Sequence, residues 1–546
     1  MECAVKSRTI IRIALFVTVA MILAIVAGCG ESEKKNGGEA PKVEQKLTMG
    51  LNASARILDP HKTTNYGDER IMNQLYDGLV ALDFDLITIK PSLAESWTVS
   101  EDGKTYVFTL RQDVKFHSGK PLTASDVKYS FDRWRDEKTA SPTSYKLGLV
   151  ESVETEGDYT VKITLSATSN TFLLNLTAPY AFILNQEAVE AAGEDYGTKS
   201  VDGTGPFIFK EWIPDDRIVC TRNEEYKWGS DVYKNKGPAF LETLVFRFLP
   251  EAGTREMEFE TGNVDMLTPG SIPRADVERL KSSDKVTAVI YDQPYTDFIG
   301  FKLTVPYLKD VRVRQAMNYA IDRKALVDDG IAGLGDPGYG PIAPVTFGYN
   351  PEVEQIGYPY DTAKAEALLE EAGWAKDSDG FRYKDGKKLV LKIHYCGGQE
   401  YDVVVPMVQA QLRAVGIDVK LVQMEFATLI NAINAGEHDS FVMGLNYAHP
   451  DGILGYYFRS TNRPYPNRFE FVNKRVDELL DTGISAPDKE DQIAAYQEVQ
   501  KIIVEEAVWI PLFYQKGVMG VSKSLKDFTP HAMVAYGIPK FMDVHK

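Results

Sequence analysis

The pattern of apolar residues changes near residue 305, and this change constrains the fold more than any other feature. Beyond it, segments with helical periodicity alternate with segments typical of strands. Residues 388–395 (KLVLKIHY) are typical of a strand, 403–416 of an amphipathic helix, and 417–424 (IDVKLVQM) of a second strand. One helix between two strands predicts a βαβ unit, and therefore an α/β region with a mostly parallel sheet.

Further helices are predicted here from their end signals. The segments 310–330 and 361–373 each begin with Asp and end with Gly. An aspartate accepts hydrogen bonds at a helix start, and glycine favours the left-handed turn that ends one. The last predicted helix, 489–507, leads into an apolar strand at 508–514.

The first half of the chain is dominated by short segments of alternating apolar and polar residues. β-Branched and aromatic residues are frequent in them, which favours half-buried strands. The predicted strands are 46–51, 105–111, 159–165, 206–212, 217–223 and 243–249.

The N-terminus has the features of an export signal. Three basic residues precede an uncharged run over 13–28, which ends in Val-Ala-Gly-Cys29. This pattern predicts a lipoprotein signal peptide over 1–28, a lipidated Cys29 and a flexible tether over 29–45. The protein is then extracytoplasmic and lipid-anchored to the cell membrane, and the alternative is an uncleaved anchor with an incidental cysteine.

Composition limits the partners and the redox chemistry. The chain has 546 residues and a net charge of −17, which argues against nucleic acid as a partner. This length predicts two or three domains. Cys220 and Cys396 are the cysteines of the exported body, and two lone buried thiols are favoured over a disulfide.

No catalytic or metal-binding motif is found. The stretch GLGDPG (333–338) matches the glycine pattern of nucleotide-binding turns, but it follows a predicted helix and contains Pro337. A nucleotide turn follows a strand and opens a helix, so a loop is predicted instead. None of the seven histidines has metal-ligand spacing. The sequence predicts no enzyme, no metal and no cofactor.

The order of several segments resembles that of a known family. The extracellular solute-binding proteins of the peptide/nickel/opine class, the substrate-capturing lipoproteins of ABC importers, are similar to this chain from about Leu47 to Phe541. The segments that carry the resemblance are ILDPHKTTNYGDERIMNQLYDGLVALD (57–83), PSLAESWTVS…SFDRW (91–134), GTGPFIFKEW…RNEEY (203–226), DVRVRQAMNYAIDRKALV (310–327) and YDTAKAEALLEEAGW (360–374).

The resemblance implies a periplasmic-binding-protein-like fold of two α/β lobes joined by a hinge. Lobe one is expected over 46–80, 200–299 and 508–546, with a subdomain inserted over 81–199. Lobe two is expected over 300–507. The chain would then cross the hinge twice, which is the usual design for closure on a ligand.

The resemblance also implies a function and partners. The expected protein is a monomeric receptor that captures a peptide or another small organic solute and delivers it to ABC permease subunits. An oligosaccharide or a nickel chelate remains an alternative ligand. A tethered signalling or chemosensory protein remains an alternative role, because one fold serves several functions.

The same resemblance suggests which residues face the ligand. They come from the loop 63–67, the turn 268–273, the hinge segment 293–297 and the strand end 440–452. Aromatic rings there offer stacking and amphipathic contact. The expected ligand-binding residues are Tyr66, Thr268, Ser271, Tyr295, Phe426, Asn446, Tyr447 and Asp451.

One departure from the family pattern concerns the ligand's charge. Members that bind free peptides usually have an Asp four residues before the proline of the strand-end motif, where this chain has Asn446. A Trp usually stands three residues earlier, at Met443 here, and 394–399 lacks the Arg that some dipeptide binders use. Asparagine accepts a hydrogen bond but has no charge, so Asp451 or Asp297 would have to pair with a ligand amine.

Overall fold

The computed structural model describes residues 43–398, 400–533 and 538–546, and its helices and strands lie within 45–546. The predicted signal peptide, Cys29 and nearly all of the tether lie outside the described residues. No described helix is both long enough and apolar enough to span a bilayer.

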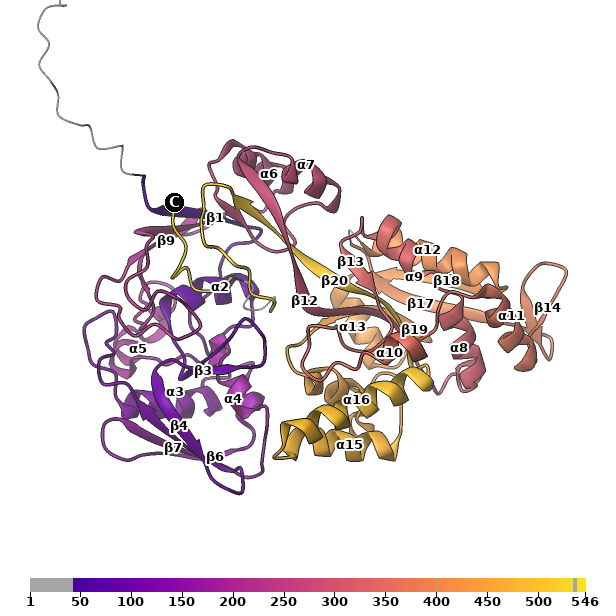
Figure 1. The fold of residues 1–546 in the computed structure, drawn as a ribbon, viewed down its shortest axis with the longest axis horizontal. Helices are drawn as coiled ribbons and strands as arrows, with labels where there is room; N and C mark the ends of the chain where they lie inside the picture. The colour runs from indigo at the N-terminus through magenta and orange to yellow at the C-terminus, as the bar shows by residue number, and fades with distance from the viewer. Residues whose placement is uncertain (1–42, 399, 534–537) are drawn as a thin grey trace, which may run out of the picture. The chain divides into compact units, whose positions relative to one another are not determined.

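Two long strands organise the largest sheet. β12 (Val286–Phe301) and β20 (Trp509–Ser522) pair antiparallel along most of their length (Figure 1). Strands of both lobes flank them in the order β18-β17-β19-β12-β20-β11-β1-β10-β9-β8. The predicted strand 508–514 is therefore only the first half of β20. Because both lobes share these two strands, β12 and β20 are the two hinge crossings.

Lobe one surrounds the strand β1, which pairs in parallel with β10 and β11. Its apolar core lies between this sheet and α2, and it includes Met49, Ile71, Phe246 and Met519. The elements are β1 (Lys46–Leu51), α2 (Tyr66–Leu75), β8 (Phe207–Ile213), β9 (Arg217–Arg222), β10 (Thr243–Phe248), α6 (Ala252–Thr261), β11 (Met266–Leu267) and α7 (Val277–Lys281).

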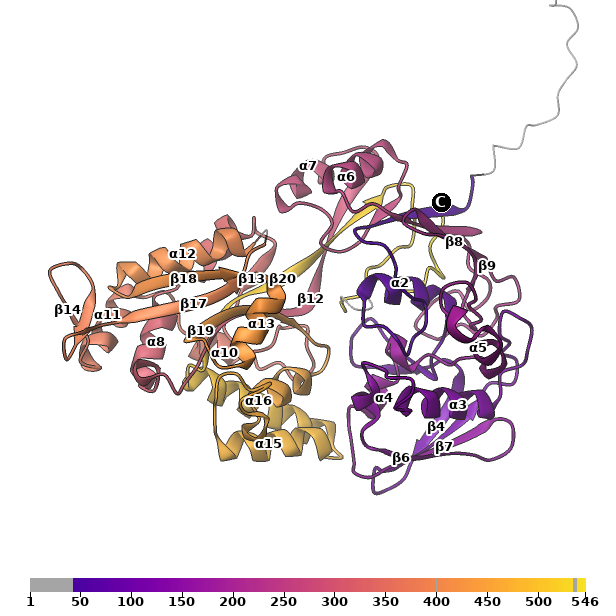
Figure 2. The ribbon, with the colours of Figure 1, turned by 180° about the vertical axis from the view of Figure 1, so that it is seen from behind.

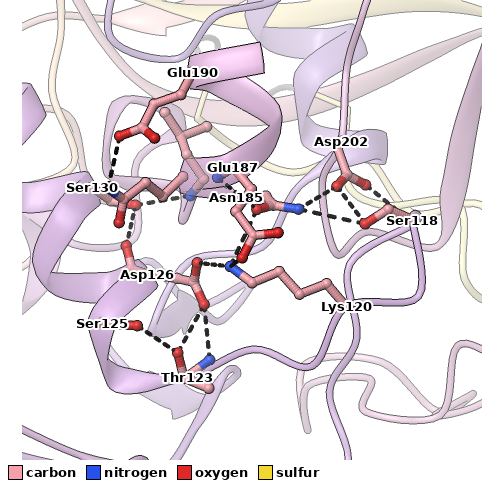
Figure 3. A network of polar contacts seen from close by, with 12 residues as sticks. Ser118, Lys120, Thr123, Ser125, Asp126, Ser130, Asn185, Glu187, Glu190 and Asp202 are labelled. Atoms are coloured by element: carbon pink, nitrogen blue, oxygen red, sulfur yellow. Dashed lines mark hydrogen bonds and ion pairs between the residues drawn. The ribbon is translucent and has the colours of Figure 1, made fainter. Parts of the chain in front are cut away.

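The inserted subdomain has its own antiparallel sheet, β4-β5-β7-β6, and its own core around Phe108, Phe131 and Trp134. A polar network ties the start of α3 to the segments around it (Figure 3). The elements are β2 (Val80–Leu82), β3 (Ile89–Pro91), β4 (Ala94–Val99), β5 (Thr105–Leu110), α3 (Ala124–Arg135), β6 (Val150–Thr155), β7 (Thr160–Leu165), α4 (Phe172–Asn175) and α5 (Gln186–Ala192).

Lobe two covers both faces of its part of the sheet with helices (Figures 1 and 2). Met317, Leu369 and Leu412 pack on one face, and Phe441, Tyr496 and Trp509 on the other. Its elements are α8 (Val311–Tyr319), α9 (Arg323–Ala325), β13 (Gly335–Pro337), α10 (Val353–Ile356), α11 (Thr362–Glu371), β14 (Ala375–Lys376), β15 (Arg382–Lys384), β16 (Lys387–Lys388), β17 (Val390–Cys396), α12 (Tyr401–Ala414), β18 (Asp418–Met424), α13 (Phe426–Asn434), β19 (Ser440–Asn446), α14 (Leu454–Phe458), α15 (Lys474–Ser485) and α16 (Lys489–Glu505).

The structure corrects two local predictions. The βαβ unit β17-α12-β18 is parallel, but β12 pairs antiparallel with both β19 and β20, so the sheet of lobe two is mixed. The predicted helix 310–330 is interrupted after Tyr319, where Asp322 caps a second helical segment. Periodicity continues across this break because both segments bury the same face against one core.

The structure also shows where the GLGDPG stretch and the two cysteines lie. GLGDPG contributes the short strand β13, which pairs with β20, so no helix follows the glycines directly. Cys220 and Cys396 are free thiols in the structure. Cys220 is buried in the core of lobe one, whereas Cys396 is only half-buried at the end of β17.

Candidate functional site

The loop before α2 presents Tyr66 at the first position of the helix. The Asn65 side chain accepts hydrogen bonds from the amides of Gly67 and Asp68, and the Thr63 hydroxyl donates to Asp68 over 2.8 Å. These contacts satisfy the exposed amides of the helix start. The polar side chains of the loop make these contacts, and the Tyr66 side chain is 51% exposed.

Tyr295 and Asn446 lie opposite each other on neighbouring strands. Tyr295 belongs to β12 and Asn446 ends β19, and the two residues are register partners in the antiparallel pair. The Tyr295 ring crosses β19 at Gly444, where an added Cβ would lie 2.4 Å from the ring. Gly444 is thus needed for this close approach. Burial raises the pKa of Tyr295, and the nearby Asp297 adds to the rise.

The turn after β19 holds Tyr447 and Asp451. The Tyr447 ring lies so close to Gly452 that a Cβ there would come within 2.7 Å of it. His449 Nδ1 accepts the amide of Asp451 over 3.3 Å, and its ring stacks on Phe347. Burial lowers the pKa of His449 to about 4, so the ring is neutral at physiological pH. His449 therefore has a structural role in the turn.

The predicted tyrosines come together. The Tyr447 amide donates to the Pro294 carbonyl over 3.2 Å, which places Tyr447 beside Tyr295, and Tyr66 adds to the rise that burial causes in the pKa of both tyrosines. Tyr66, Tyr295 and Tyr447 come from lobe one, the hinge and lobe two respectively. Three parts of the chain thus contribute to one aromatic wall, which suits stacking and amphipathic contact with a small ligand.

The other predicted residues are placed differently. Thr268 and Ser271 are buried and share a 2.6 Å hydrogen bond between their hydroxyls. Phe426 begins α13 and is 58% exposed, with Glu425 capping the helix before it. The structure therefore groups Tyr66, Tyr295, Asn446 and Tyr447, whereas Thr268 and Ser271 are engaged with each other.

The hinge strand carries buried polar atoms for which the described residues offer no hydrogen-bond partner. On β12 they are Tyr291 Oη, Gln293 Oε1, Thr296 Oγ1 and Asp297 Oδ2, and on lobe two they include Asn446 Nδ2 and Asp451 Oδ1. A buried polar group without a partner costs about 1–3 kcal/mol, and a charged group more. Such atoms also occur elsewhere among the described residues, for example at His394 and Trp509, but those on β12 and in the segment 446–451 lie where a ligand or its water can satisfy them.

Asp297 is the most buried of these carboxyls. Its Oδ1 accepts the hydroxyl of Tyr401, the first residue of α12, over 2.6 Å, and its Oδ2 has no described partner. Burial raises the pKa of Asp297 to about 8, although the Tyr401 hydrogen bond opposes the rise. Asp451 also has a raised pKa from burial, which Arg459 and Lys146 oppose. Both carboxyls remain open to a cationic partner.

Two cavities adjoin these residues. One, of about 310 Å³, is lined by Gln293 and Tyr295 of β12, by Arg274 of lobe one and by Glu400 of lobe two. Arg274 and Glu400 approach to 3.9 Å and form an ion pair between the lobes. The other, of about 260 Å³, lies between Leu173 of the inserted subdomain and Phe347 of lobe two. Concave space between lobes is where small ligands usually bind.

Sequence reasoning missed two further aromatic residues. Tyr145 of the inserted subdomain is 70% exposed, and Tyr465 of lobe two is 50% exposed. Tyr465 adds to the burial effect that raises the pKa of Tyr145, so the two rings approach each other from different parts of the chain. Tyr145 lies in a short 3-10 helix (Ser144–Leu147) and Tyr465 in a loop, and neither segment has a helical or strand pattern in the sequence. The sequence signal was only a large aromatic residue next to prolines in NRPYPN.

Comparison with known proteins identifies the family. The family model of the bacterial extracellular solute-binding proteins, family 5 (middle), matches residues 88–465. The chain belongs to this family. That membership confirms the predicted resemblance and makes the protein a solute-binding protein rather than an enzyme.

Relatives of this solute-binding protein are named after different ligands. It is 28% identical to heme-binding protein A of Haemophilus influenzae, over 94% of this chain and 95% of that protein. It is 27% identical to the oligopeptide-binding protein AppA of Bacillus subtilis, over 95% and 96%. The ligand therefore does not follow from the family alone.

Solved structures confirm the two-lobed fold. HbpA2 from Haemophilus parasuis matches with a TM-score of 0.81 and 28% identity, over 92% of this chain and all of that one. NikA from Brucella suis, solved with Fe(III)-EDTA, matches with a TM-score of 0.79 and 26% identity, over 92% and 100%. Among the described residues, no group of three His, Cys, Asp or Glu is arranged to hold a metal ion.

Proposed function

We propose that this solute-binding protein captures a short peptide or a similar small organic solute between its lobes and delivers it to an ABC permease. The observation that carries the proposal is the set of unpaired polar atoms on β12 and at the end of β19. Peptides offer both donors and acceptors at regular spacing, which suits Gln293, Asn446 and the tyrosine hydroxyls nearby. Their side chains suit the aromatic wall.

Two unpaired carboxyls support a ligand that bears an amine. Asp297 lies on β12 opposite Gly444, two residues before Asn446 on β19, and Asp451 follows Asn446 by five residues in the chain; family members usually have the acid at position 446. A charged amine held by either would gain roughly ten- to a hundredfold in affinity. Oligosaccharides and nickel chelates are the competing ligand classes, because neither requires an acid at these positions.

A thermal-shift screen distinguishes these classes. Peptides, oligosaccharides and nickel chelates are added separately to the protein, and a ligand that binds only the folded state raises the melting temperature. We expect a peptide pool to raise it, with confirmation by calorimetric titration. A rise with oligosaccharides or nickel chelates alone would contradict the peptide proposal, and an unchanged melting temperature with all three would redirect the search to a signalling role.

We further propose that Cys29 anchors the receptor to the cell membrane through acyl chains and that the protein acts as a monomer. Support comes from the sequence of the export signal, because these residues are outside the described part of the chain. The Cys29→Ser variant should accumulate as an unlipidated precursor. Mass spectrometry of the native N-terminus tests this, and an unmodified Cys29 thiol would refute it.

A further inference from the structure

Arg468 lies in the loop between α14 and α15 and is only 5% exposed. Its guanidinium group stands over two tyrosine rings, 4.9 Å from the ring centre of Tyr465 and 5.9 Å from that of Tyr457. Such contacts attract the cation to the ring faces. A guanidinium has five N–H groups, which lose their hydrogen bonds to water on burial. Contacts with ring faces do not replace these hydrogen bonds.

Arg468 is incompletely paired. Nε donates to Asn434 Oδ1 over 2.8 Å and the guanidinium also bonds the Tyr457 hydroxyl, while Nη1 is buried and has no partner among the described residues. Within that same part of the chain no carboxylate forms an ion pair with it; the nearby Glu470 pairs with Lys302 instead. The positive charge is therefore buried without a counter-charge, which is unfavourable unless something else supplies one.

Two other buried arginines show what full pairing is like in this protein. Arg382, 1% exposed, bonds Glu370 and the carbonyls of Val415 and Trp374. Arg323, 3% exposed, bonds the Asn318 side chain and three backbone carbonyls. Arg382 and Arg323 are thus saturated with acceptors, whereas Arg468 is not; Arg70 and Arg255 also have a buried Nε without a partner among the described residues.

The unpaired group adjoins the aromatic wall. Arg468 opposes the rise that burial causes in the pKa of Tyr447, so its charge lies near that ring. The Tyr465 ring beside it is half exposed, and its hydroxyl bonds Tyr456 over 3.1 Å. Access of a ligand to the guanidinium therefore depends on the position of the Tyr465 ring, which lies 4.9 Å from it.

We infer that Arg468 is an anion subsite that receives a carboxylate of the ligand. This inference rests on the proposed function for the place of the ligand and adds the chemistry of one end of it. Arginine matches a carboxylate with two parallel hydrogen bonds, and the tyrosine rings exclude water around them. A free peptide would then place its carboxyl terminus at Arg468 and its amine toward an unpaired acid.

One experiment changes the protein and the ligand together. Trialanine and its C-terminal amide are titrated calorimetrically into the wild type, Arg468→Met and a control, Arg475→Met. Arg475 is an exposed arginine of the same lobe, paired with Glu498. We expect the wild type and the control to prefer the free acid roughly ten- to a hundredfold, and Arg468→Met to lose that preference. Equal weakening of both ligands would make Arg468 a packing residue and overturn the inference.

A second measurement does not depend on peptides. Crystals of the full chain are soaked in sodium bromide, and the anomalous signal locates bound halide. We expect a bromide ion within hydrogen-bond reach of the Arg468 guanidinium and none at Arg475. A halide there without peptide binding would keep the anion subsite but refute the peptide proposal. No halide at Arg468 would overturn the inference even if peptides bind. If Arg468→Met does not fold, Arg468→Lys replaces it and shows whether a positive charge alone is enough for the preference.

Discussion

The inserted subdomain and the hinge both contain buried polar side chains, but they pair them differently. Around the start of α3, Asp126 bonds Lys120 over 2.7 Å, and Asp202 bonds Asn185 over 2.6 Å (Figure 3). None of the four appears among the buried side chains with an unpaired polar atom in the described residues, whereas Asp297 and Asn446 at the hinge do. Buried polar groups that only support a fold are normally satisfied.

The difference distinguishes buried polar side chains that support the fold from those that are available to a ligand. The inserted network is complete without any ligand, so it stabilises the empty protein. The hinge groups lower the stability of the empty protein, because each unpaired atom has lost its water. Binding proteins gain affinity from groups that are held in place but unsatisfied, since a ligand then supplies the missing partner. The following variants test this contrast.

The largest effect is expected from breaking the complete network. Asp126→Ala removes a buried carboxylate that pairs with the half-buried Lys120 amine and accepts the Thr123 amide at the start of α3. Each hydrogen bond to a buried charged group is worth about 1.5–3 kcal/mol, so losing both contacts should cost about 3–5 kcal/mol. The free energy of unfolding from urea titration should fall by that amount while ligand affinity of the folded protein stays unchanged. Lys128→Ala, which breaks an exposed pair with Asp132, is the control, with a loss below about 1 kcal/mol.

The opposite sign is expected at the hinge. Asp297→Asn keeps an acceptor for Tyr401 and removes a buried acid whose pKa is raised to about 8. Because the folded state holds this proton more tightly, the wild type should lose stability as pH rises from about 4 to 8. The variant should lack this contribution, so its stability relative to the wild type should rise between pH 4 and pH 8, by at least about 1.4 kcal/mol, the free energy of one pKa unit. Melting temperatures of both proteins across this pH range check the prediction. The same pH dependence in both would show that the pKa of Asp297 is not raised in the folded protein.

Asn446 tests whether the cleft lacks an acid where the family usually has one. Asn446→Asp should gain about 1.5–2 kcal/mol for amine-bearing peptides and little or nothing for N-acetylated ones, because a charge-assisted bond forms only with the amine. Calorimetric titration of both proteins with free and acetylated peptides measures it. Loss of wild-type binding on acetylation would support the pairing of the amine with Asp297 or Asp451 proposed above, whereas no gain in Asn446→Asp would show that residue 446 does not face the amine.

Much of the fold could be predicted from local patterns. The strands at 46–51, 217–222 and 243–248 and the helix at 362–371 follow their periodicity and end signals within one or two residues. Those signals are local, so no tertiary information was needed. The mixed sheet of lobe two was not predictable, because the direction in which β12 and β20 pair depends on two segments more than 200 residues apart.

The candidate site was predicted only in part. Tyr66, Tyr295, Asn446 and Tyr447 could be named because they occupy segments that resemble family motifs, and the structure groups them. Arg468 and Tyr465 could not be named, since an arginine in a loop is usually solvated. Its missing partner becomes visible only when the fold buries it.

The smallest effect is expected where the inserted subdomain touches lobe two. The amide and side chain of Asn170 donate to the carbonyls of Ile484 and Ala486 at the end of α15, over 3.1 and 3.0 Å. Asn170→Ala removes the side-chain bond, worth about 1 kcal/mol, and should shift the balance between closed and open forms about fivefold toward open. Scattering without ligand should then give a larger radius of gyration, while saturating ligand restores the wild-type value. Ser166→Ala, on an exposed part of the same subdomain, is the control. An unchanged radius in Asn170→Ala would mean that this contact does not influence closure, and that the unpaired hinge groups alone set the energy a ligand gains by closing the lobes.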